Sequence, residues 1–501
     1  MKRWGLPLFG LALSAAAFRL ICYFVFRPVG VEPDGLGLAV LFWPAGHQPA
    51  EWAAQLLPRV AGYWPPAYPA ANALVGRLLG DPFLAGRVVS ALCAGLLVWV
   101  TALLVRRLTD SRAAGLFAGS LMACAPLAVA WDVRIRPETM FLAAYLAAVY
   151  FAVAYLQDRR GRDLALATLL SGAAALVKYD IIVFLPPLAV FWIAHLRGRQ
   201  YRIVPWGALA AAGWLCSLIW LLTHEGARAG DYRQLLGGET LRQFFPWLGL
   251  TLAALPAVVT WPVAALAIWG GYSLVAPRTD RPAGALLLYL ILAHLAVIAV
   301  GYNWISRYLL AALPFVVVLA GVGWHALPPL RGLKAVALGL SLAVCAVLAV
   351  VWVQAERDKW TETMEVGRAV ANLPRDATVW TDDPYLTPYW ARRDLRTLDD
   401  LNQARPGDYV VLHDLYGALR HKRLVETSLT QLESRGRTQI LADRTTVAYP
   451  LSGDVLDFDA AELAHVRDLR ALGPRPFWQR NQPHSIRSVL LRLTPPEGGR
   501  R

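Results

Sequence analysis

Long apolar runs dominate the first 353 residues of this chain. The first run, at 4–26, follows Lys2 and Arg3 and is long enough to cross about 30 Å of hydrocarbon as a helix. Hydrophobic residues make up 57% of the 501 residues and charged residues only 17%, a balance unlike that of a water-soluble globular domain. The runs therefore predict an all-α polytopic membrane domain.

The apolar runs predict about eleven membrane spans. They cover approximately residues 4–26, 82–105, 112–131, 138–157, 163–177, 180–196, 203–222, 247–274, 283–301, 308–326 and 333–353. The fifth and sixth are short. An alternative for them is a tight helical hairpin, bent at Lys178-Tyr179-Asp180, that does not fully cross the membrane.

Basic residues alternate with the spans in the pattern that sets membrane topology. With the N-terminus inside, every inner loop is basic, and an odd number of spans then places the C-terminal tail outside. Ser14-Ala15-Ala16-Ala17 resembles the end of a cleaved signal peptide, but the apolar run continues to Phe26, which favours an uncleaved anchor. The inner-loop residues are Arg106, Arg107, Arg112, Arg159, Arg160, Arg162, Arg197, Arg199, Arg202, Arg278, Arg281, Arg331 and Lys334.

The net charge of +14 does not indicate a nucleic-acid partner. Residues 1–353 hold 27 basic and 14 acidic residues, whereas residues 354–501 hold 22 and 21. The excess therefore lies among the loops that set topology, and the tail is nearly neutral. The five cysteines all lie inside apolar runs, so no disulfide framework is expected in the tail, and no Cys/His metal spacing is present.

Two regions are expected on the outer face besides the short loops. Residues 27–81 mix aromatic residues with prolines, which suits an interfacial segment that contributes to an active site; helices are expected at Pro49–Val60 and Asn72–Leu79. Residues 354–501 form a second domain, predicted as a small α/β fold without a catalytic motif. Its expected helices are Trp360–Leu373 and Gly417–Arg435, and its expected strands are Ala377–Trp380, Tyr409–His413, Thr438–Leu441 and Arg487–Leu493.

Charged residues at the outer ends of the spans are exceptions to this pattern, so they are candidates for chemistry. Arg and Lys can neutralise a phosphate leaving group, and a carboxylate can take a proton from an acceptor hydroxyl or amine. A carboxylate pair can instead hold a divalent metal, Mg²⁺ or Mn²⁺. The candidates are Glu32, Asp34, Asp132, Arg134, Arg136, Glu138, Lys178, Asp180 and Arg307.

Each candidate also has an ordinary structural interpretation. Asp34 could end a helix at the interface, Glu138 could favour a helix N-terminus after Pro137, and Lys178 could form a structural bridge to Asp180. The others could contact solvent or lipid headgroups; these are Glu32, His47, Arg134, Arg136 and Arg307.

Four groups of residues, in chain order, resemble the membrane-embedded GT-C glycosyltransferases. The resemblance is to bacterial glycosyltransferase family 39, which includes protein O-mannosyltransferases and the aminoarabinose transferase of lipid A. The matching groups are Glu32-Pro33-Asp34; Tyr63-Trp64-Pro65-Pro66-Ala67-Tyr68-Pro69 with Gly80-Asp81-Pro82-Phe83 and Ala85-Gly86-Arg87-Val88-Val89-Ser90; Arg136-Pro137-Glu138 with Ala175-Leu176-Val177-Lys178; and Ser306-Arg307-Tyr308-Leu309-Leu310 with Pro314.

The resemblance implies an inverting transfer of a sugar from a polyprenyl-phosphate donor to a protein, lipid or glycan acceptor. The reaction would take place on the outer face of the bacterial cytoplasmic membrane. Asp34 would be the general base, with Glu32 as the other candidate, and Lys178, Arg307, Arg134 and Arg136 would hold the donor phosphate. Asp132, Glu138, Tyr68 and His47 are further site candidates.

This chain departs from the family pattern at its first motif. The family has an adjacent Asp-Glu pair, whereas Pro33 separates Glu32 from Asp34 here. Which carboxylate is the base, and whether a metal is held, are therefore left open.

Two other functions fit parts of the pattern. A transporter or flippase of lipid-linked sugars would need polar residues at mid-depth in the spans, but the charges gather at the outer face. A binding protein whose function lies in the tail would not need eleven spans as an anchor. The outer charges therefore favour an interfacial enzyme.

Overall fold

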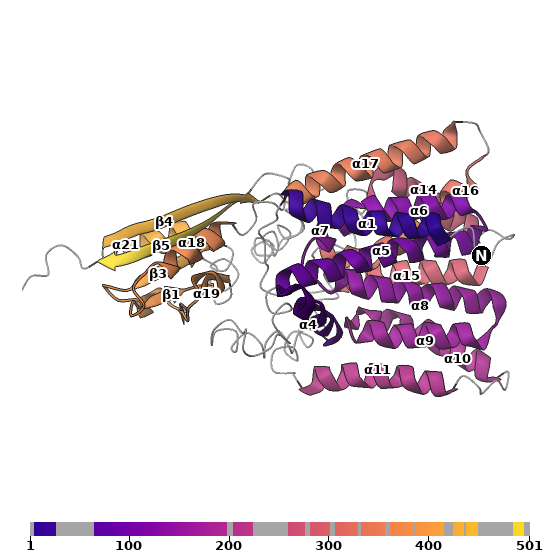
Figure 1. Cartoon of the computed structure of the whole chain (residues 1–501), viewed down its shortest axis with the longest axis horizontal. Helices are drawn as coiled ribbons and strands as arrows, with labels where there is room; N and C mark the ends of the chain where they lie inside the picture. The colour runs from indigo at the N-terminus through magenta and orange to yellow at the C-terminus, as the bar shows by residue number, and fades with distance from the viewer. Residues whose placement is uncertain are drawn as a thin grey trace, which may run out of the picture. The chain divides into compact units, whose positions relative to one another are not determined.

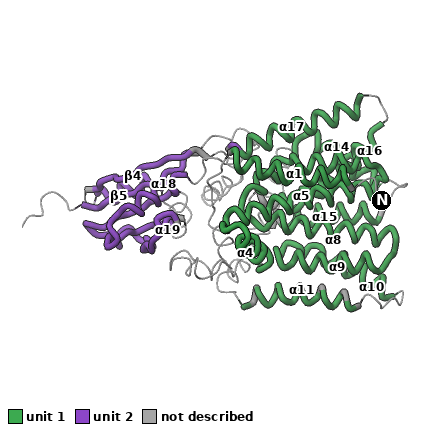
Figure 2. The backbone as a smooth tube through the Cα atoms, viewed as in Figure 1, with its two compact units in different colours: residues 1–26, 59–353 green, residues 27–58, 354–501 purple. Residues whose placement is uncertain are grey.

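The structure, a computed structural model, describes residues 5–26, 65–197, 204–223, 259–275, 281–300, 306–328, 332–355, 361–383, 386–414, 424–434, 437–448 and 484–494. The described residues form two compact units, one within residues 1–26 and 59–353 and the other within residues 354–501 (Figure 2). Each unit is described separately below.

The first unit is a bundle of apolar helices whose long members run side by side (Figure 1). In chain order it contains α1 (Gly5–Phe26), α4 (Ala67–Leu79), α5 (Pro82–Thr109), α6 (Arg112–Cys124), α7 (Pro126–Asp132), α8 (Glu138–Asp158), α9 (Gly161–Ala175), the 3₁₀ helix η2 (Tyr179–Phe184), α10 (Leu185–Arg197), α11 (Val204–Thr223), α14 (Trp261–Val275), α15 (Arg281–Val300), the 3₁₀ helix η5 (Ser306–Ala311), α16 (Leu313–Ala326) and α17 (Leu333–Ala355).

The lengths of these helices confirm a membrane protein with several spans. Among the described residues, six helices are long and apolar enough to cross a membrane, and a seventh span results if α6 and α7 are counted together. Three shorter apolar helices lie at Gly207–Trp220, Trp261–Val275 and Pro282–Val297. Each expected span coincides with one or two of the helices, while the total of eleven and the N-in, C-out topology remain predictions.

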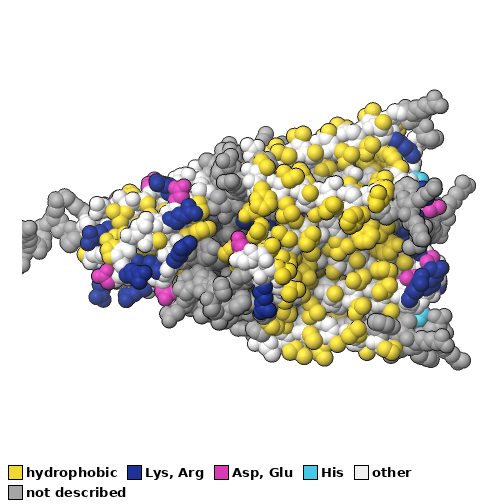
Figure 3. Space-filling model, in the orientation of Figure 1, with side chains coloured by type: hydrophobic (Ala, Val, Ile, Leu, Met, Phe, Trp, Pro, Cys, Tyr) yellow, Lys and Arg dark blue, Asp and Glu magenta, His cyan; other side chains and the backbone are white. Residues whose placement is uncertain are grey.

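The surface of this unit matches a lipid environment. Large apolar side chains are widely exposed, for example Leu6 at 84%, Leu78 at 82% and Ile268 at 76%. In Figure 3 hydrophobic side chains cover most of the visible face of the unit, and the charged side chains lie at its two ends. Such a surface is stable in hydrocarbon but not in water.

The expected third span, 112–131, is not one straight helix. It is divided into α6 and α7, which meet at an angle of 54°. The break lies at Ala125-Pro126, where proline cannot donate the backbone hydrogen bond that would continue α6. The sequence analysis joined the two because the apolar run continues through the bend.

Helices α14 and α16 approach each other at paired glycines. A Cβ on Gly270 would overlap the carbonyl oxygen of Leu319, and a Cβ on Gly323 would overlap the carbonyl oxygen of Leu266. Small residues let helix backbones approach closely within a membrane, where packing contacts drive helix association. The neighbouring Gly271 differs, because its Cβ would meet only side chains, at 3.6 Å or more.

This difference predicts that Gly270→Ala lowers stability by about 1–3 kcal/mol, the usual cost of overpacking a close contact. Gly271→Ala, one residue along the same helix, is the matched control and is expected to leave stability nearly unchanged. Thermal unfolding of both variants in detergent measures the effect. Equal unfolding temperatures for the two variants would contradict the close approach.

The second unit is built on a mixed five-stranded sheet. Its strands are β1 (Val379–Thr381), β2 (Arg396–Thr397), β3 (Tyr409–His413), β4 (Arg437–Ala448) and β5 (His484–Thr494), in the order β2-β1-β3-β5-β4. Strand β1 pairs in parallel with β2 and β3, whereas β5 pairs antiparallel with β3 and β4. The helical elements are α18 (Thr361–Ala371), α19 (Leu386–Ala391), η6 (Leu401–Gln403) and α21 (Val425–Glu433).

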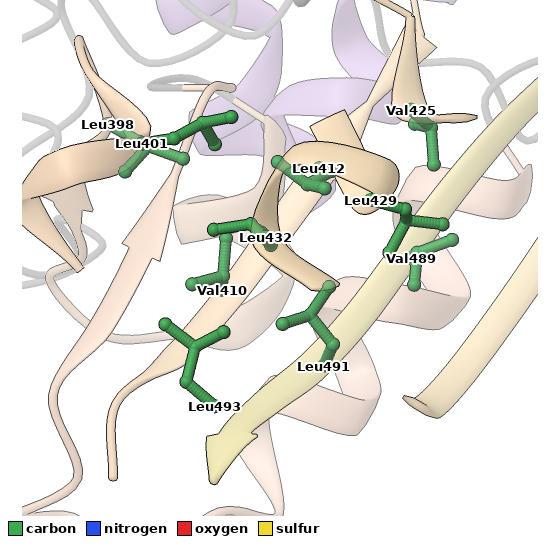
Figure 4. Close-up of a cluster of buried hydrophobic side chains, with 10 residues drawn as sticks. All are labelled: Leu398, Leu401, Val410, Leu412, Val425, Leu429, Leu432, Val489, Leu491 and Leu493. Carbon is green, nitrogen blue, oxygen red and sulfur yellow. The ribbon is translucent and has the colours of Figure 1, made fainter. Parts of the chain in front are cut away.

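The residues of this sheet alternate between two apolar clusters. Val410, Leu412, Val489 and Leu491 pack with α21 on one face (Figure 4). Val411 and Leu490, one position along, belong to the second cluster with residues of α18. Successive side chains of a strand point to opposite faces of the sheet, which explains this period of two. The α/β class predicted for the tail is confirmed. Strand β4 extends well beyond the expected 438–441, and β2 and α19 were not expected.

Candidate functional site

Lys178 occupies a buried position between two carboxylates. It follows the end of α9 in extended conformation and immediately precedes η2. Its Nζ lies 2.8 Å from Asp180 Oδ2 and 3.5 Å from Glu138 Oε1. Lys178 and Glu138 are almost fully buried, whereas the Asp180 side chain is 35% exposed. The structure therefore confirms the Lys178–Asp180 bridge and adds Glu138, from 40 residues earlier in the chain.

Glu138 is the first residue of α8 and follows Pro137. A carboxylate in the first turn is stabilised by the helix dipole, as the sequence analysis proposed. The position also directs the side chain to Lys178, while a role for Glu138 in the site stays a prediction.

Arg134 and Arg136 lie in the connection between α7 and α8, residues 133–137. Both are buried, and both guanidinium groups lie over the ring of Trp131, at 4.0 and 5.8 Å from its centroid. Ser90 Oγ lies 3.3 Å from the carbonyl oxygen of Arg134 and 3.5 Å from that of Arg136. These contacts attach the connection to α5. Ser90 belongs to a segment that resembles the family, but it was not among the predicted site residues.

Tyr68 contacts the same serine that bonds to this connection. It is fully buried in α4, and its hydroxyl group lies 3.1 Å from Ser90 Oγ and 3.2 Å from the carbonyl oxygen of Gly86. The preceding residue, Ala67, donates its N–H to the carbonyl oxygen of Leu176, close to Lys178. Helix α4 is therefore bonded both to α5, beside the connection that contains Arg134 and Arg136, and to Leu176, two residues before Lys178.

Asp132 is neutralised by a residue that the sequence analysis missed. Its Oδ2 lies 3.0 Å from Nε of Arg19, and both side chains are almost fully buried. Thr139 Oγ1 donates to the other carboxylate oxygen of Asp132. A single cation in the middle of an apolar span was the available signal, since such a residue needs a partner.

Arg307 lies in η5, which packs against α7 and α15. The backbone of this segment is described, whereas the Arg307 side chain is not. Glu32, Asp34 and His47, together with the helix expected at Pro49–Val60, lie outside the described residues. Their roles therefore stay predictions.

Among the described residues, no group of three or more His, Cys, Asp or Glu side chains is arranged to hold a metal ion. Glu138 and Asp180 are both within 4 Å of the ammonium group of Lys178. These two described carboxylates therefore do not fit Mg²⁺ or Mn²⁺, because the Lys178 ammonium group already contacts both, and a metal at Glu32 and Asp34 stays a prediction.

The second unit has a buried polar cluster of its own. His413 Nε2 lies 3.2 Å from Glu362 Oε1, and the backbone N–H of His413 donates to Asp382 Oδ2 at 3.0 Å. Burial raises the pKa of Asp382 to about 7. Burial alone would lower the pKa of His413, but the bond and charge of Glu362 and the nearby aspartates outweigh it and raise that pKa. Because these groups bond one another inside the unit, they stabilise its interior.

Several charged residues of the first unit gather around the start of α8. Glu138 contacts Lys178, and the next residue, Thr139, contacts Asp132. Asp132 in turn precedes the connection that contains Arg134 and Arg136. Carboxylates and cations therefore meet where three apolar helices end, an arrangement suited to an anionic ligand at a membrane surface.

Comparisons with known proteins point to one class of enzyme. Residues 64–220 match the family described as dolichyl-phosphate-mannose-protein mannosyltransferase. No curated protein sequence matches the chain.

Solved structures share the fold. The chain is similar to ArnT from Cupriavidus metallidurans bound to undecaprenyl phosphate, at a TM-score of 0.58 and 13% identity, and to the apo state of that protein, at 0.56 and 14%. Each comparison covers 86% of this chain and 96% of the other. The mycobacterial arabinofuranosyltransferase AftD scores 0.46 at 17% identity, over 89% of this chain and 39% of that one. Residues 64–220 therefore resemble this mannosyltransferase family, which supports a glycosyltransferase activity, and the chain has the multi-pass membrane fold of ArnT.

Proposed function

We propose that this protein transfers a sugar from a polyprenyl-phosphate donor to an acceptor at the outer face of the bacterial cytoplasmic membrane, with inversion at the anomeric carbon. The observation that carries the proposal is the buried Lys178, held by Glu138 and Asp180 next to the connection that contains Arg134 and Arg136. The ArnT structure bound to undecaprenyl phosphate supports a donor of this chemical class.

The leaving group of such a reaction is a lipid phosphate. Negative charge develops on its oxygens as the glycosidic bond breaks, and fixed cations at the bilayer surface stabilise that charge strongly because little water competes. Lys178 is the fixed cation of this site, with Arg134, Arg136 and Arg307 as additional donors. A buried ammonium group between two carboxylates is held in place before the donor arrives, which lowers the reorganisation required.

The acceptor must lose a proton as it attacks. In an inverting transfer it attacks the anomeric carbon from the side opposite the phosphate, so the base and the phosphate-binding cations lie on opposite sides of the sugar. Asp34 is the proposed base, with Glu32 as the alternative. Both lie between α1 and α4 in the chain, and the first residue of α4, Ala67, donates its N–H to the carbonyl oxygen of Leu176, two residues before Lys178.

The test is a transfer assay with the full-length protein in liposomes that contain a polyprenyl-phosphate sugar. We expect loss of the lipid-linked sugar together with a new glycosidic bond on the acceptor, detected by mass spectrometry. Movement of intact lipid-linked sugar across the bilayer without a new bond would instead identify a flippase. The acceptor for this assay can be identified by comparing the envelope glycolipids and glycoproteins of the wild type with those of a strain that lacks the gene.

A further inference from the structure

Arg19 lies in the middle of the apolar helix α1 and is only 1% exposed. Its guanidinium group bonds to Asp132 Oδ2 at 3.0 Å and to the carbonyl oxygens of Met122 at 3.3 Å and Ala15 at 3.4 Å, and also to the carbonyl oxygen of Ala123. Four acceptors from three elements therefore surround one buried cation.

Two of these acceptors lie at the break between α6 and α7. In a continuous helix the Met122 carbonyl would accept from the N–H of residue 126, but residue 126 is proline and has none. A backbone carbonyl without a partner is costly inside a membrane. Arg19 supplies the missing donor and extends to the next carbonyl, of Ala123. The planar guanidinium group suits this task because it presents several donors in fixed directions.

Asp132 connects the same cation to the site. It is the last residue of α7, and its carboxylate also accepts from Thr139 in the first turn of α8. The residues between them, 133–137, contain Arg134 and Arg136, and the residue before Thr139 is Glu138, the partner of Lys178. Both ends of this connection are therefore attached to Arg19 through Asp132.

We infer that Arg19 and Asp132 are positioning residues, which hold the 54° bend between α6 and α7 and thereby place residues 133–138 for catalysis. Neither residue is in the catalytic machinery itself. The catalytic part of the inference rests on the proposed function, because it assumes that Arg134, Arg136 and Glu138 belong to the donor site. That Arg19 and Asp132 hold the bend follows from their hydrogen bonds and does not depend on the proposed function.

The alternative is that the Arg19–Asp132 pair contributes only to overall packing, as other buried ion pairs do. A packing role would affect the amount of folded protein and leave the folded molecules fully active. A positioning role would leave folded molecules with a displaced connection and slow turnover. The test therefore measures local backbone order and kcat on folded protein.

The first variant is Arg19→Met, in full-length protein reconstituted in nanodiscs. We expect hydrogen exchange of the backbone amides in residues 123–137 to rise about tenfold, because their local opening becomes easier. We expect kcat of the folded fraction to fall about 10²-fold, since small misplacements of catalytic groups have effects of this size. Arg19→Lys should recover part of the loss, because it keeps the charge opposite Asp132.

Arg107→Met is the matched control. Arg107 pairs with Asp158 at 2.8 Å, at the opposite end of α8, about 30 Å from Glu138 along the helix axis. Its loss should change neither the exchange of residues 123–137 nor kcat. If Arg19→Met does not fold, Asp132→Asn replaces it. That variant is nearly isosteric and leaves the bonds from Arg19 to the carbonyls, so exchange is expected to rise at residues 132–139 and kcat to fall.

The inference would be overturned if folded Arg19→Met, or Asp132→Asn, had the same hydrogen exchange rates and the same kcat as the wild-type protein. Faster exchange with unchanged kcat would also overturn it, because the connection would then move without effect on catalysis. If the wild-type protein itself transfers no sugar, the proposed function fails. The structural role of Arg19 can still be tested in that case, because an unchanged rate of hydrogen exchange in Arg19→Met would show that Arg19 does not stabilise the bend.

Discussion

Asp34→Asn is expected to reduce sugar transfer by about 10²–10⁴-fold, the usual contribution of a general base. Asparagine has nearly the same shape as aspartate but cannot accept the proton of the acceptor. Donor binding should be unchanged, because the base acts on the acceptor side of the sugar. Initial rates of transfer and binding of polyprenyl phosphate, both on folded protein, measure the two effects.

Glu32→Gln is the control for this assignment. Glu32 and Asp34 flank Pro33, so the two variants alter the same loop by the same chemical change. A large loss in Asp34→Asn with a small one in Glu32→Gln would support Asp34 as the base. The reverse result would assign the base to Glu32, and full activity in both variants would refute a base in this loop.

Lys178→Met is expected to lower kcat/KM for the donor by about 10²–10³-fold, as the loss of one donor to a developing negative charge does. The variant should also be less stable by about 3–5 kcal/mol, because Glu138 is left as a buried charge without this partner. Transfer rates at several donor concentrations and thermal unfolding of the same preparation separate the two effects.

The double variant Lys178→Met/Glu138→Gln distinguishes catalysis from stability. It removes both members of the buried contact, so most of the lost stability should return, because the second substitution removes the buried negative charge that had lost Lys178. Transfer should remain low, since no cation is restored. Recovery of transfer together with stability would show that Lys178 serves only to neutralise Glu138. Lys178→Arg, which keeps the charge, is expected to retain part of the activity.

The sequence predicted most of the secondary structure because its signals are local. Apolar runs of sufficient length located the helices of the first unit, and short segments typical of strands located β1, β3 and β5. The helix expected at Trp360–Leu373 is α18, and the fold class of both units was predicted. The bend at Pro126 was missed because hydropathy is the same on either side of it, although the proline itself was the available sign.

The candidate site was predicted less completely. Lys178 and Asp132 were identified as charges that need a partner, and the bridge to Asp180 lies within two residues of Lys178 in the chain. The partners Glu138 and Arg19 lie 40 and 113 residues from the groups they contact. Helix periodicity carries no information at such separations. Arg19 was overlooked because one arginine hardly changes the hydropathy of α1.

By itself, the sequence determined that this chain is a membrane bundle with charged residues at the ends of its spans and an α/β tail. Exposing backbone polar groups and charges to hydrocarbon is costly, so long apolar runs form helices and the charges lie at their ends. Both features can be recognised in the sequence alone. Only the tertiary structure decided which charges meet. Lys178 with Glu138, and Arg19 with Asp132 and the carbonyls before Pro126, come together because particular helices pack side by side. Such contacts depend on the positions of whole helices, which no local pattern specifies.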